Sequence, residues 1–170
     1  VVDTHRPDST MQPKILDKCK EVCVIDHHRK GAHFINNPIF QYHEPQSSSA
    51  SELVTELIFY QTTKVNVSEQ VANFLLSGIC LDTKFFKSGV SGKTFEMAMN
   101  LKNYQASVEA VNEYFKEEYE EMKLISGIVN TSKAIHPGIY VAKADEYDII
   151  TRTVLSKAAE EILATKGVQA

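Results

Sequence analysis

The sequence predicts an α/β fold: a parallel sheet with flanking helices, a long connecting helix and part of a second α/β unit. Three observations support this prediction. The short apolar run Val22–Ile25 has the character of a buried strand and ends abruptly in the polar residues Asp26–Arg29. Apolar residues at helical spacing follow in three stretches between residues 50 and 100. A further helical pattern then leads to one more strand, predicted at residues 139–144, and one more helix.

Composition and charge exclude several classes of protein. The 170 residues are 43% hydrophobic and 24% charged, which is ordinary for a globular chain with a core. The formal net charge of −4 argues against duplex nucleic acid as a partner, although a local basic pocket can still bind phosphate. No apolar run approaches the roughly 20 residues of a membrane helix, so we expect a cytoplasmic segment without membrane contact. The three cysteines lack a paired metal-finger spacing and are interpreted as reduced thiols.

The N-terminal part is predicted to be strand, loop and strand. The first residues resemble the end of a strand that stops at Asp3, and since a domain seldom starts inside a strand, we expect this N-terminus to be a cut rather than a domain boundary. Pro13 can open a short helix that leads into the strand at 22–26. Residues 31–49 contain prolines and a serine run without helical periodicity, which indicates a loop with a short strand near 39–42.

The helices are predicted from apolar residues that recur three and four positions apart. Ser68 is the expected N-cap of the second helix. The fourth pattern is long and is interpreted as a connecting helix over residues 107–133. The predicted buried faces, in chain order, are Ala50, Leu53, Val54, Leu57 and Ile58; Val71, Phe74, Leu75 and Ile79; Phe95, Ala98 and Met99; Val108, Val111, Phe115, Met122, Ile125 and Val129; and Val154, Leu155, Ala158, Ala159, Ile162 and Leu163.

Four serines, Ser47, Ser48, Ser49 and Ser51, crowd the start of the first helix. In one interpretation a single serine is the N-cap, worth about 1 kcal/mol, and the others lie in a solvated loop. In the other interpretation the site binds phosphate, because a helix N-terminus offers unpaired amides and the hydroxyls of Ser49 and Ser51 would add donors. The sequence leaves both interpretations open.

The candidate site consists of acids and histidines at or just past the ends of apolar stretches: Asp3, Asp26, His27, His28 and Asp82. Because the ends of parallel strands lie along one edge, where ligands bind, we expect these side chains to lie together. Two carboxylates and an imidazole suit manganese or a similar divalent ion. His28 and Arg29 would hold phosphate, and paired ions would activate water against phosphorus. The alternative is a strand-end turn whose polar side chains are satisfied without a ligand.

Other ionisable groups are weaker candidates. The four glutamates between residues 117 and 121 are interpreted as a solvated helix face. His33, His43 and His136 lie in loop-like stretches and are interpreted as surface residues. His5 is ambiguous, because in an extended chain it can point the same way as the side chain two residues before it.

Four motifs, in this order, resemble the DHH phosphoesterase superfamily and look most like its GdpP-type cyclic-di-AMP phosphodiesterases. The motifs are Val2–Pro7, Val24–Arg29, Glu44–Leu57 and Gly78–Lys84. The resemblance covers about the first 105 residues, and the tail resembles the opening of the companion DHHA1 domain. It implies a DHH domain at 1–106, a connecting helix at 107–133 and a partial DHHA1 domain at 134–170.

The resemblance also implies a role for each matching residue. Asp3 would be a bridging metal ligand, His27 a second ligand, and Asp82 a ligand of a second ion. Asp26 would orient His27 from behind. The implied cofactor is a pair of Mn²⁺ ions.

The remaining implied roles concern the substrate. His28 and Arg29 would face the substrate phosphate, so that the catalytic residues would be Asp26, His28 and Arg29. The implied reaction is hydrolysis of cyclic di-AMP to linear pApA. Within the superfamily, a nanoRNase or a phosphoadenosine phosphatase is the alternative enzyme, and a nucleotide-binding module without catalysis is the alternative outside enzymology.

Two departures from the family pattern bear on activity. The family begins its site with a His-x-x-x-Asp-x-Asp segment, and this sequence contains no Asp-x-Asp and no two adjacent glycines for the DHHA1 substrate motif. Three ligands cannot hold two six-coordinate ions, so we expect this chain to be inactive by itself. The resemblance further implies a longer parent protein, anchored in the cell membrane with its catalytic part in the cytosol, and homodimerisation.

Overall fold

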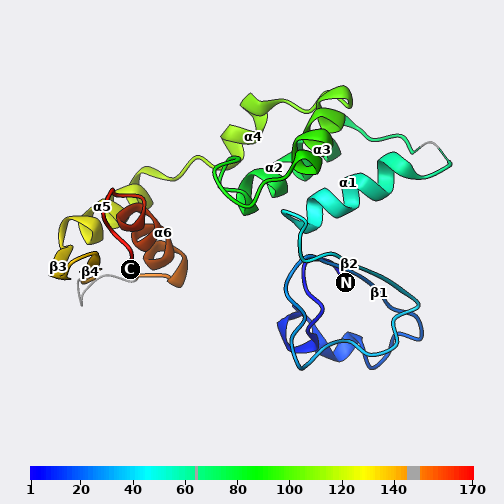
Figure 1. Ribbon diagram of the computed structural model, residues 1–170, viewed down its shortest axis with the longest axis horizontal. Coiled ribbons are helices and arrows are strands. Elements are labelled where there is room, and N and C mark those ends of the chain that lie inside the picture. Colours follow the sequence, from blue (N-terminus) through cyan, green and yellow to red (C-terminus); the bar gives the residue numbers. More distant parts are fainter. Residues whose placement is uncertain (64, 145–149) are drawn as a thin grey trace. The chain divides into compact units, whose positions relative to one another are not determined.

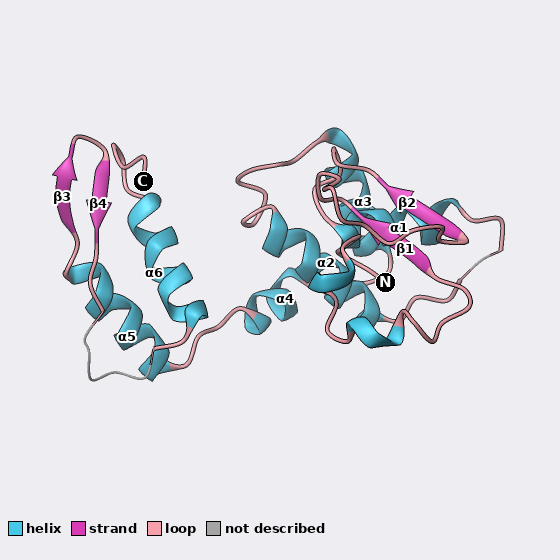
Figure 2. Ribbon diagram, turned by 90° about the horizontal axis from the view of Figure 1, so that it is seen from below, coloured by secondary structure: helices cyan, strands magenta, loops and turns pink. Residues whose placement is uncertain are grey.

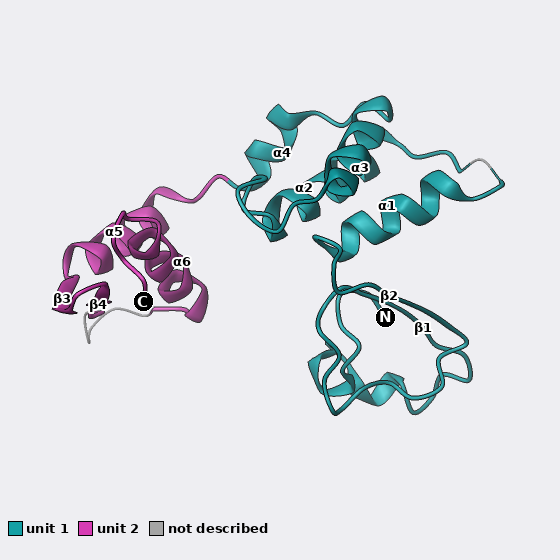
Figure 3. Ribbon diagram, in the orientation of Figure 1, with its two compact units in different colours: residues 1–115 teal, residues 116–170 magenta. Residues whose placement is uncertain are grey.

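The computed structural model describes residues 1–63, 65–144 and 150–170 (Figure 1). The chain divides into two compact units, residues 1–115 and residues 116–170 (Figure 3). This division falls inside the segment that the sequence predicts as a connecting helix. The two units are therefore described separately.

The first unit contains the parallel sheet that the sequence predicts. Strand β1 (Cys23–Asp26) pairs in parallel with β2 (Phe40–His43), and Asp26 lies opposite His43 at the ends of the two strands. On the other side of β1, the first residues run parallel to it through a bridge between Val2 and Ile25. Asp3 and Asp26 thus reach the same edge of the sheet, and the predicted α/β class is confirmed.

In the first unit, short 3₁₀ turns precede β1 and α-helices follow β2. Their order is η1 (Pro7–Ser9) and η2 (Pro13–Ile15), both 3₁₀ turns, then α1 (Ala50–Tyr60), α2 (Glu69–Asp82), α3 (Gly92–Asn103) and α4 (Val108–Tyr114). Each α-helix begins at a serine whose side chain accepts a hydrogen bond from a backbone amide of the first turn, and Ser68 is one of them, as predicted. The core of these helices comprises Val67, Ala72, Leu76, Ile79, Cys80, Met97, Leu101, Ala106 and Val111.

The buried faces of α2 and α3 differ from the prediction. Phe74 and Phe95, predicted to be buried, are each 54% exposed, and Val71 and Met99 are exposed as well. The contact face is rotated from the predicted one and contains Ala72, Leu76, Met97 and Leu101, because the packing of the neighbouring helices decides which side of each helix is buried. The aromatic rings pair near the surface instead: Phe74 stacks on Tyr114 and Phe95 on Phe86, with ring centroids 5.4 and 5.6 Å apart.

The single helix predicted for residues 107–133 is two helices in the structure, α4 and α5 (Tyr119–Asn130). The apolar stripe that predicted one helix serves two cores: Val111 is buried in the first unit and Ile125 in the second. Between Phe115 and α5 the chain has only charged residues, Lys116–Glu118, so no apolar side chain there favours a continuous buried stripe. Val108 and Met122, predicted to be buried, are exposed.

The second unit packs a hairpin and two helices (Figure 2). Strand β3 (Lys133–His136) pairs antiparallel with β4 (Ile139–Val141), and α5 packs on α6 (Arg152–Leu163). The prediction has a strand at 139–144 but none at β3. The buried core consists of Ile125, Ile128, Val154 and Ala158. Three residues predicted to be buried on α6 are exposed, namely Leu155, Ala159 and Leu163.

A stability prediction arises at the end of α3. Gln105 has a left-handed backbone (φ 69°) and its amide donates to the Lys102 carbonyl, while the Ala106 amide donates to the Leu101 carbonyl. These bonds form a Schellman motif, whose left-handed position favours glycine. Gln105→Gly is therefore expected to raise the free energy of unfolding by roughly 0.5–1 kcal/mol in urea titrations. Gln105→Ala keeps the left-handed strain, and an equal gain from alanine would contradict this explanation.

Candidate metal centre

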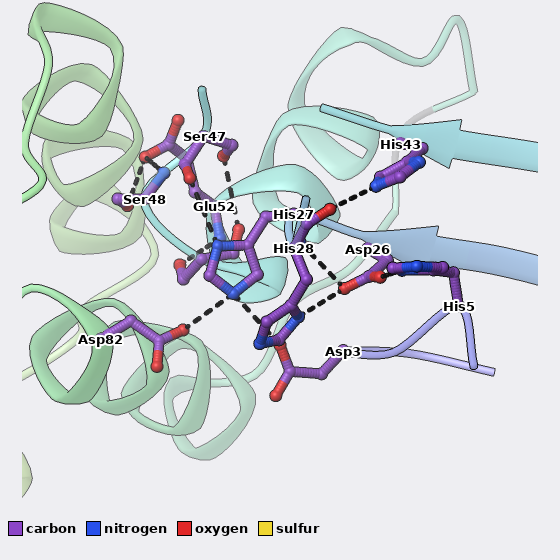
Figure 4. A network of polar contacts seen from close by, with 11 residues as sticks. Asp3, His5, Asp26, His27, His28, His43, Ser47, Ser48, Glu52 and Asp82 are labelled. Carbon is purple, nitrogen blue, oxygen red and sulfur yellow. Dashed lines mark hydrogen bonds and ion pairs between the residues drawn. The ribbon is translucent and has the colours of Figure 1, made fainter. Parts of the chain in front are cut away.

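Three side chains that the sequence predicts as metal ligands meet in the first unit (Figure 4). His27 directly follows β1, and its Nε2 lies 3.4 Å from Oδ1 of Asp3 and 3.6 Å from Oδ2 of Asp82. One imidazole nitrogen thus lies between two carboxylates that are far apart in the sequence. His28 adds a further nitrogen close to Asp3 and His27.

Asp82 reaches this group from a helix, although the prediction has all the acids at one sheet edge. It is the last residue of α2, where the buried Thr83 hydroxyl donates to the Ile79 carbonyl and ends the helix. Residues 84–86 then have left-handed backbones, with φ between 50° and 62°, and Asp3 has φ 64°. Such conformations cost roughly 1 kcal/mol each outside glycine and concentrate at functional sites.

The orientation of His27 differs from the prediction that Asp26 holds it. The Nδ1 of His27 lies 3.3 Å from the Ser47 carbonyl oxygen. The carboxylate of Asp26 bonds to the next residue instead, since its Oδ1 accepts from the backbone amide and Nδ1 of His28, at 3.2 and 2.8 Å. The reason is the alternation of an extended chain, in which residues 26 and 28 point to the same side and residue 27 to the other.

A second histidine network lies behind the group. The Gly31 amide donates to Nε2 of His5 at 3.0 Å, so the proton of this ring is on Nδ1, which donates to Oδ2 of Asp26. His5 and Asp26 are both buried. The ring of His43 lies 5.0 Å from that of His5 and its Nε2 bonds to the His28 carbonyl, so His43, predicted to be a surface residue, is half-buried and part of the network. Asp26 thereby anchors His28 to the sheet.

Electrostatics at the centre favour a bound cation. Burial raises the pKa of the Asp82 carboxyl, and Asp3 raises it further, while His27 and His28 act in the opposite direction. The hydrogen bond to Asp26 raises the pKa of His28, against the effect of burial, and the charges of Asp26, Asp3 and Asp82 add to the rise. A divalent cation would offset the repulsion between the two carboxylates.

The spacing and chemistry of the donors also fit such an ion. Two ligand atoms held about 2.1 Å from one metal ion lie roughly 3.0–3.5 Å apart, close to the spacing around His27 Nε2. A mixed set of carboxylate oxygens and imidazole nitrogen suits manganese and related divalent metals. The ligand atoms of Asp3, His27 and His28 all lie within 4.8 Å of one another, a grouping compatible with one divalent ion, and Asp82 approaches this group at His27 Nε2.

The residues predicted to bind phosphate have different surroundings. Arg29 is exposed and lines a pocket of about 730 Å³ together with Asp3 and His28. Ser49 is the buried N-cap of α1, and its hydroxyl accepts from the Glu52 amide. Ser51 packs against α2, where a Cβ on Gly78 would lie 2.1 Å from its hydroxyl oxygen. Both serines thus have structural contacts, and their phosphate role stays a prediction.

Comparison with known proteins identifies the family. Residues 1–79 match the DHH family, N-terminal domain. The chain therefore contains a DHH domain. Over 170 residues, all of this chain, it is 35% identical to the cyclic-di-AMP phosphodiesterase PdeA of Listeria monocytogenes, and it spans 26% of that protein.

One further relative and one solved structure are also similar to this chain. A probable manganese-dependent inorganic pyrophosphatase of Thermotoga maritima is 35% identical over 108 residues, which are 64% of this chain and 19% of that protein. The structure matches an exopolyphosphatase-related protein from Bacteroides fragilis with a TM-score of 0.85, covering 98% of this chain and 51% of that one. At 16% identity, this last likeness shows the fold alone.

Sequence reasoning left His5 ambiguous and missed three further neighbours of the centre: His43, the Ser47 carbonyl, and Glu52, whose Oε2 bonds to Ser48. Glu52 had a readable signal, since Ser49 and Glu52 are spaced as in a capping box. The carbonyl had none, because any residue type supplies one.

Proposed function

We propose that the chain is part of a metal-dependent phosphodiesterase that hydrolyses cyclic di-AMP to linear pApA. The observation that carries the proposal is the position of His27 Nε2 between Asp3 and Asp82 in a DHH domain. Similarity to the Listeria phosphodiesterase along the whole chain supports the substrate. Because the chain spans about a quarter of that relative, the activity is proposed for the longer protein.

Asp3, His27 and Asp82 would hold the metal, with Mn²⁺ as the proposed ion and two ions in the intact site. When bound, such ions supply Lewis acidity that activates water and offsets charge on the phosphate. The carboxylate of Asp26 holds Nδ1 of His28, which leaves the Nε2–H of the protonated ring to donate to a phosphate oxygen. Arg29, on the wall of the same pocket, would bind a second phosphate oxygen.

Location and assembly also belong to the proposal. The part of the chain that the structure describes has no helix long and apolar enough to span a membrane. We propose that the catalytic part lies in the cytosol of a protein anchored to the membrane elsewhere, that residues 134–170 open a DHHA1 domain, and that the protein forms a homodimer.

Pyrophosphate hydrolysis is the second candidate, favoured by the similarity to the Thermotoga pyrophosphatase. A nanoRNase or a phosphoadenosine phosphatase would use the same ligands. A chimaera in which residues 1–170 replace the matching segment of the Listeria phosphodiesterase separates these activities. With Mn²⁺ in the assay, its products are measured from four substrates: cyclic di-AMP, pyrophosphate, phosphoadenosine phosphate and short linear RNA.

The proposal predicts pApA from cyclic di-AMP as the main product. Activity should be absent in the His27→Ala chimaera and in the 170-residue chain by itself. If the chimaera cleaved pyrophosphate or RNA in preference to cyclic di-AMP, that compound would become the proposed substrate. A folded chimaera that binds cyclic di-AMP with Mn²⁺ and leaves it intact would contradict catalysis and favour a binding module.

A further inference from the structure

A buried glutamate lies behind the metal centre (Figure 4). Glu52, in the first turn of α1, is only 1% exposed. Its Oε2 accepts hydrogen bonds from the amide and hydroxyl of Ser48, whereas Oε1 has no partner among the residues that the structure describes. Burying a carboxylate with an unsatisfied oxygen costs free energy, so stability alone does not explain a glutamate at this position.

The bonds of Glu52 fix a turn that contacts the metal centre. Ser48, which it holds, directly follows Ser47, whose carbonyl oxygen lies 3.3 Å from Nδ1 of His27. The Ser47 amide in turn donates to the Glu44 carbonyl at 3.0 Å. The turn is therefore held on both sides of the carbonyl that faces His27.

A carbonyl oxygen can only accept a hydrogen bond. Its partner, Nδ1 of His27, must then carry the ring proton, and in the neutral ring Nε2 is left with a free lone pair. Nε2 is the nitrogen that faces Asp3 and Asp82. The Ser47 carbonyl thus selects the one neutral form of the ring that can bind a metal between these carboxylates.

We propose that Glu52 is a positioning residue that holds the metal-binding tautomer of His27, acting through Ser48 and the Ser47 carbonyl. The inference rests on the proposed metal centre and adds to it a residue that touches neither metal nor substrate. It also explains why a glutamate occupies a buried position where its carboxylate costs free energy. Partners that orient metal-binding histidines typically contribute 10-fold to 100-fold to metal affinity.

The test uses the 170-residue chain with ¹⁵N-labelled histidine. NMR of the ring nitrogens without metal, at a pH where His27 is neutral, reports the tautomer, and titration with Mn²⁺ alone reports the affinity. Glu52→Ala should give a mixture of tautomers and about 10-fold to 100-fold weaker binding. Glu52→Gln should restore most of both, because its amide oxygen can accept from Ser48. The control Glu56→Gln changes a carboxylate of the same helix, bonded to Tyr42 and Lys93, and should alter neither.

A folded Glu52→Ala protein that keeps the Nδ1–H tautomer and its Mn²⁺ affinity overturns the inference. If that variant does not fold, Ser48→Ala, which removes one of the two bonds to Glu52, decides: a partial tautomer shift supports the inference, and an unchanged ring overturns it. The tautomer is read without metal. Absence of Mn²⁺ binding in the unaltered chain would therefore count against the proposed function. The NMR measurement of the His27 tautomer would still test the role of Glu52.

Discussion

Replacing His27 with alanine is expected to weaken Mn²⁺ binding to the chain by at least about 100-fold. The substitution removes the imidazole nitrogen that lies between Asp3 and Asp82, and without it the remaining carboxylates bind a divalent ion weakly in water. Isothermal titration of the chain and the variant measures the change directly.

The matched control is His136→Ala, which removes an exposed histidine of the second unit. It should leave the affinity unchanged. Circular dichroism should show that both variants remain folded, since His27 contributes no apolar contact to the core formed by α2, α3 and α4. Binding by His27→Ala within threefold of the unaltered chain would refute the role of His27 as a ligand.

Replacing Asp26 with asparagine is expected to lower the free energy of unfolding by about 3 kcal/mol. Asp26 is fully buried and accepts from both His5 and His28, so an amide nitrogen placed against either donor leaves a buried polar group unpaired. Chemical denaturation measures the loss. The exposed Asp17 gives a matched control, because Asp17→Asn should change stability by less than about 0.5 kcal/mol.

The pH dependence of this loss has a definite sign. Burial raises the pKa of Asp26, but the bonds from His28 and His5 outweigh it, and the net pKa lies below the ordinary 3.8. The carboxylate therefore stabilises the fold above pH 3.8, and this stabilisation disappears as pH falls through the lowered value. The bond to Asp26 raises the pKa of His28 above 6.5, so its charged pairing is complete below pH 6.5 and is lost as pH rises through the raised value.

The difference between the chain and Asp26→Asn should consequently be greatest between about pH 4 and 6.5. Only a small part of it depends on the charge of His28, whose side chain is 56% exposed and screened by solvent. A difference that grows steadily above pH 8 would contradict the assignment of the Asp26–His28 pair.

Sequence reasoning brought together the proposed ligands of the centre but not the structure that orients them. Asp3 and His27 could be placed together because strand ends share an edge, a rule that needs only local pattern. Asp82 was predicted in the group from the same rule, yet it arrives from the end of α2, since its apolar run is helical. Asp26 bonds to His28 and not to His27 because side chains alternate in an extended chain. The sequence pattern does not show whether the chain stays extended past the end of the strand, so this partner could not be predicted.

The limits of the fold prediction have a similar physical origin. Helical spacing located α1, α2, α3 and α6, but it could not show which apolar residues would be buried, because the contact face depends on neighbouring helices. Phe74 and Tyr114 illustrate this, because their rings stack although the two residues are 40 positions apart in the sequence. The break between α4 and α5 depends on the two cores, which no local window contains.

The most direct test of the account locates the ion. Crystals of the chain grown with Mn²⁺ would be measured at the manganese absorption edge, and the anomalous difference density would show each site. The account predicts density in contact with His27 Nε2 and at least one of the Asp3 and Asp82 carboxylates, and no such density in His27→Ala crystals. Manganese found only elsewhere on the chain, with no density at His27 Nε2, would contradict the assignment of this cluster as a metal centre.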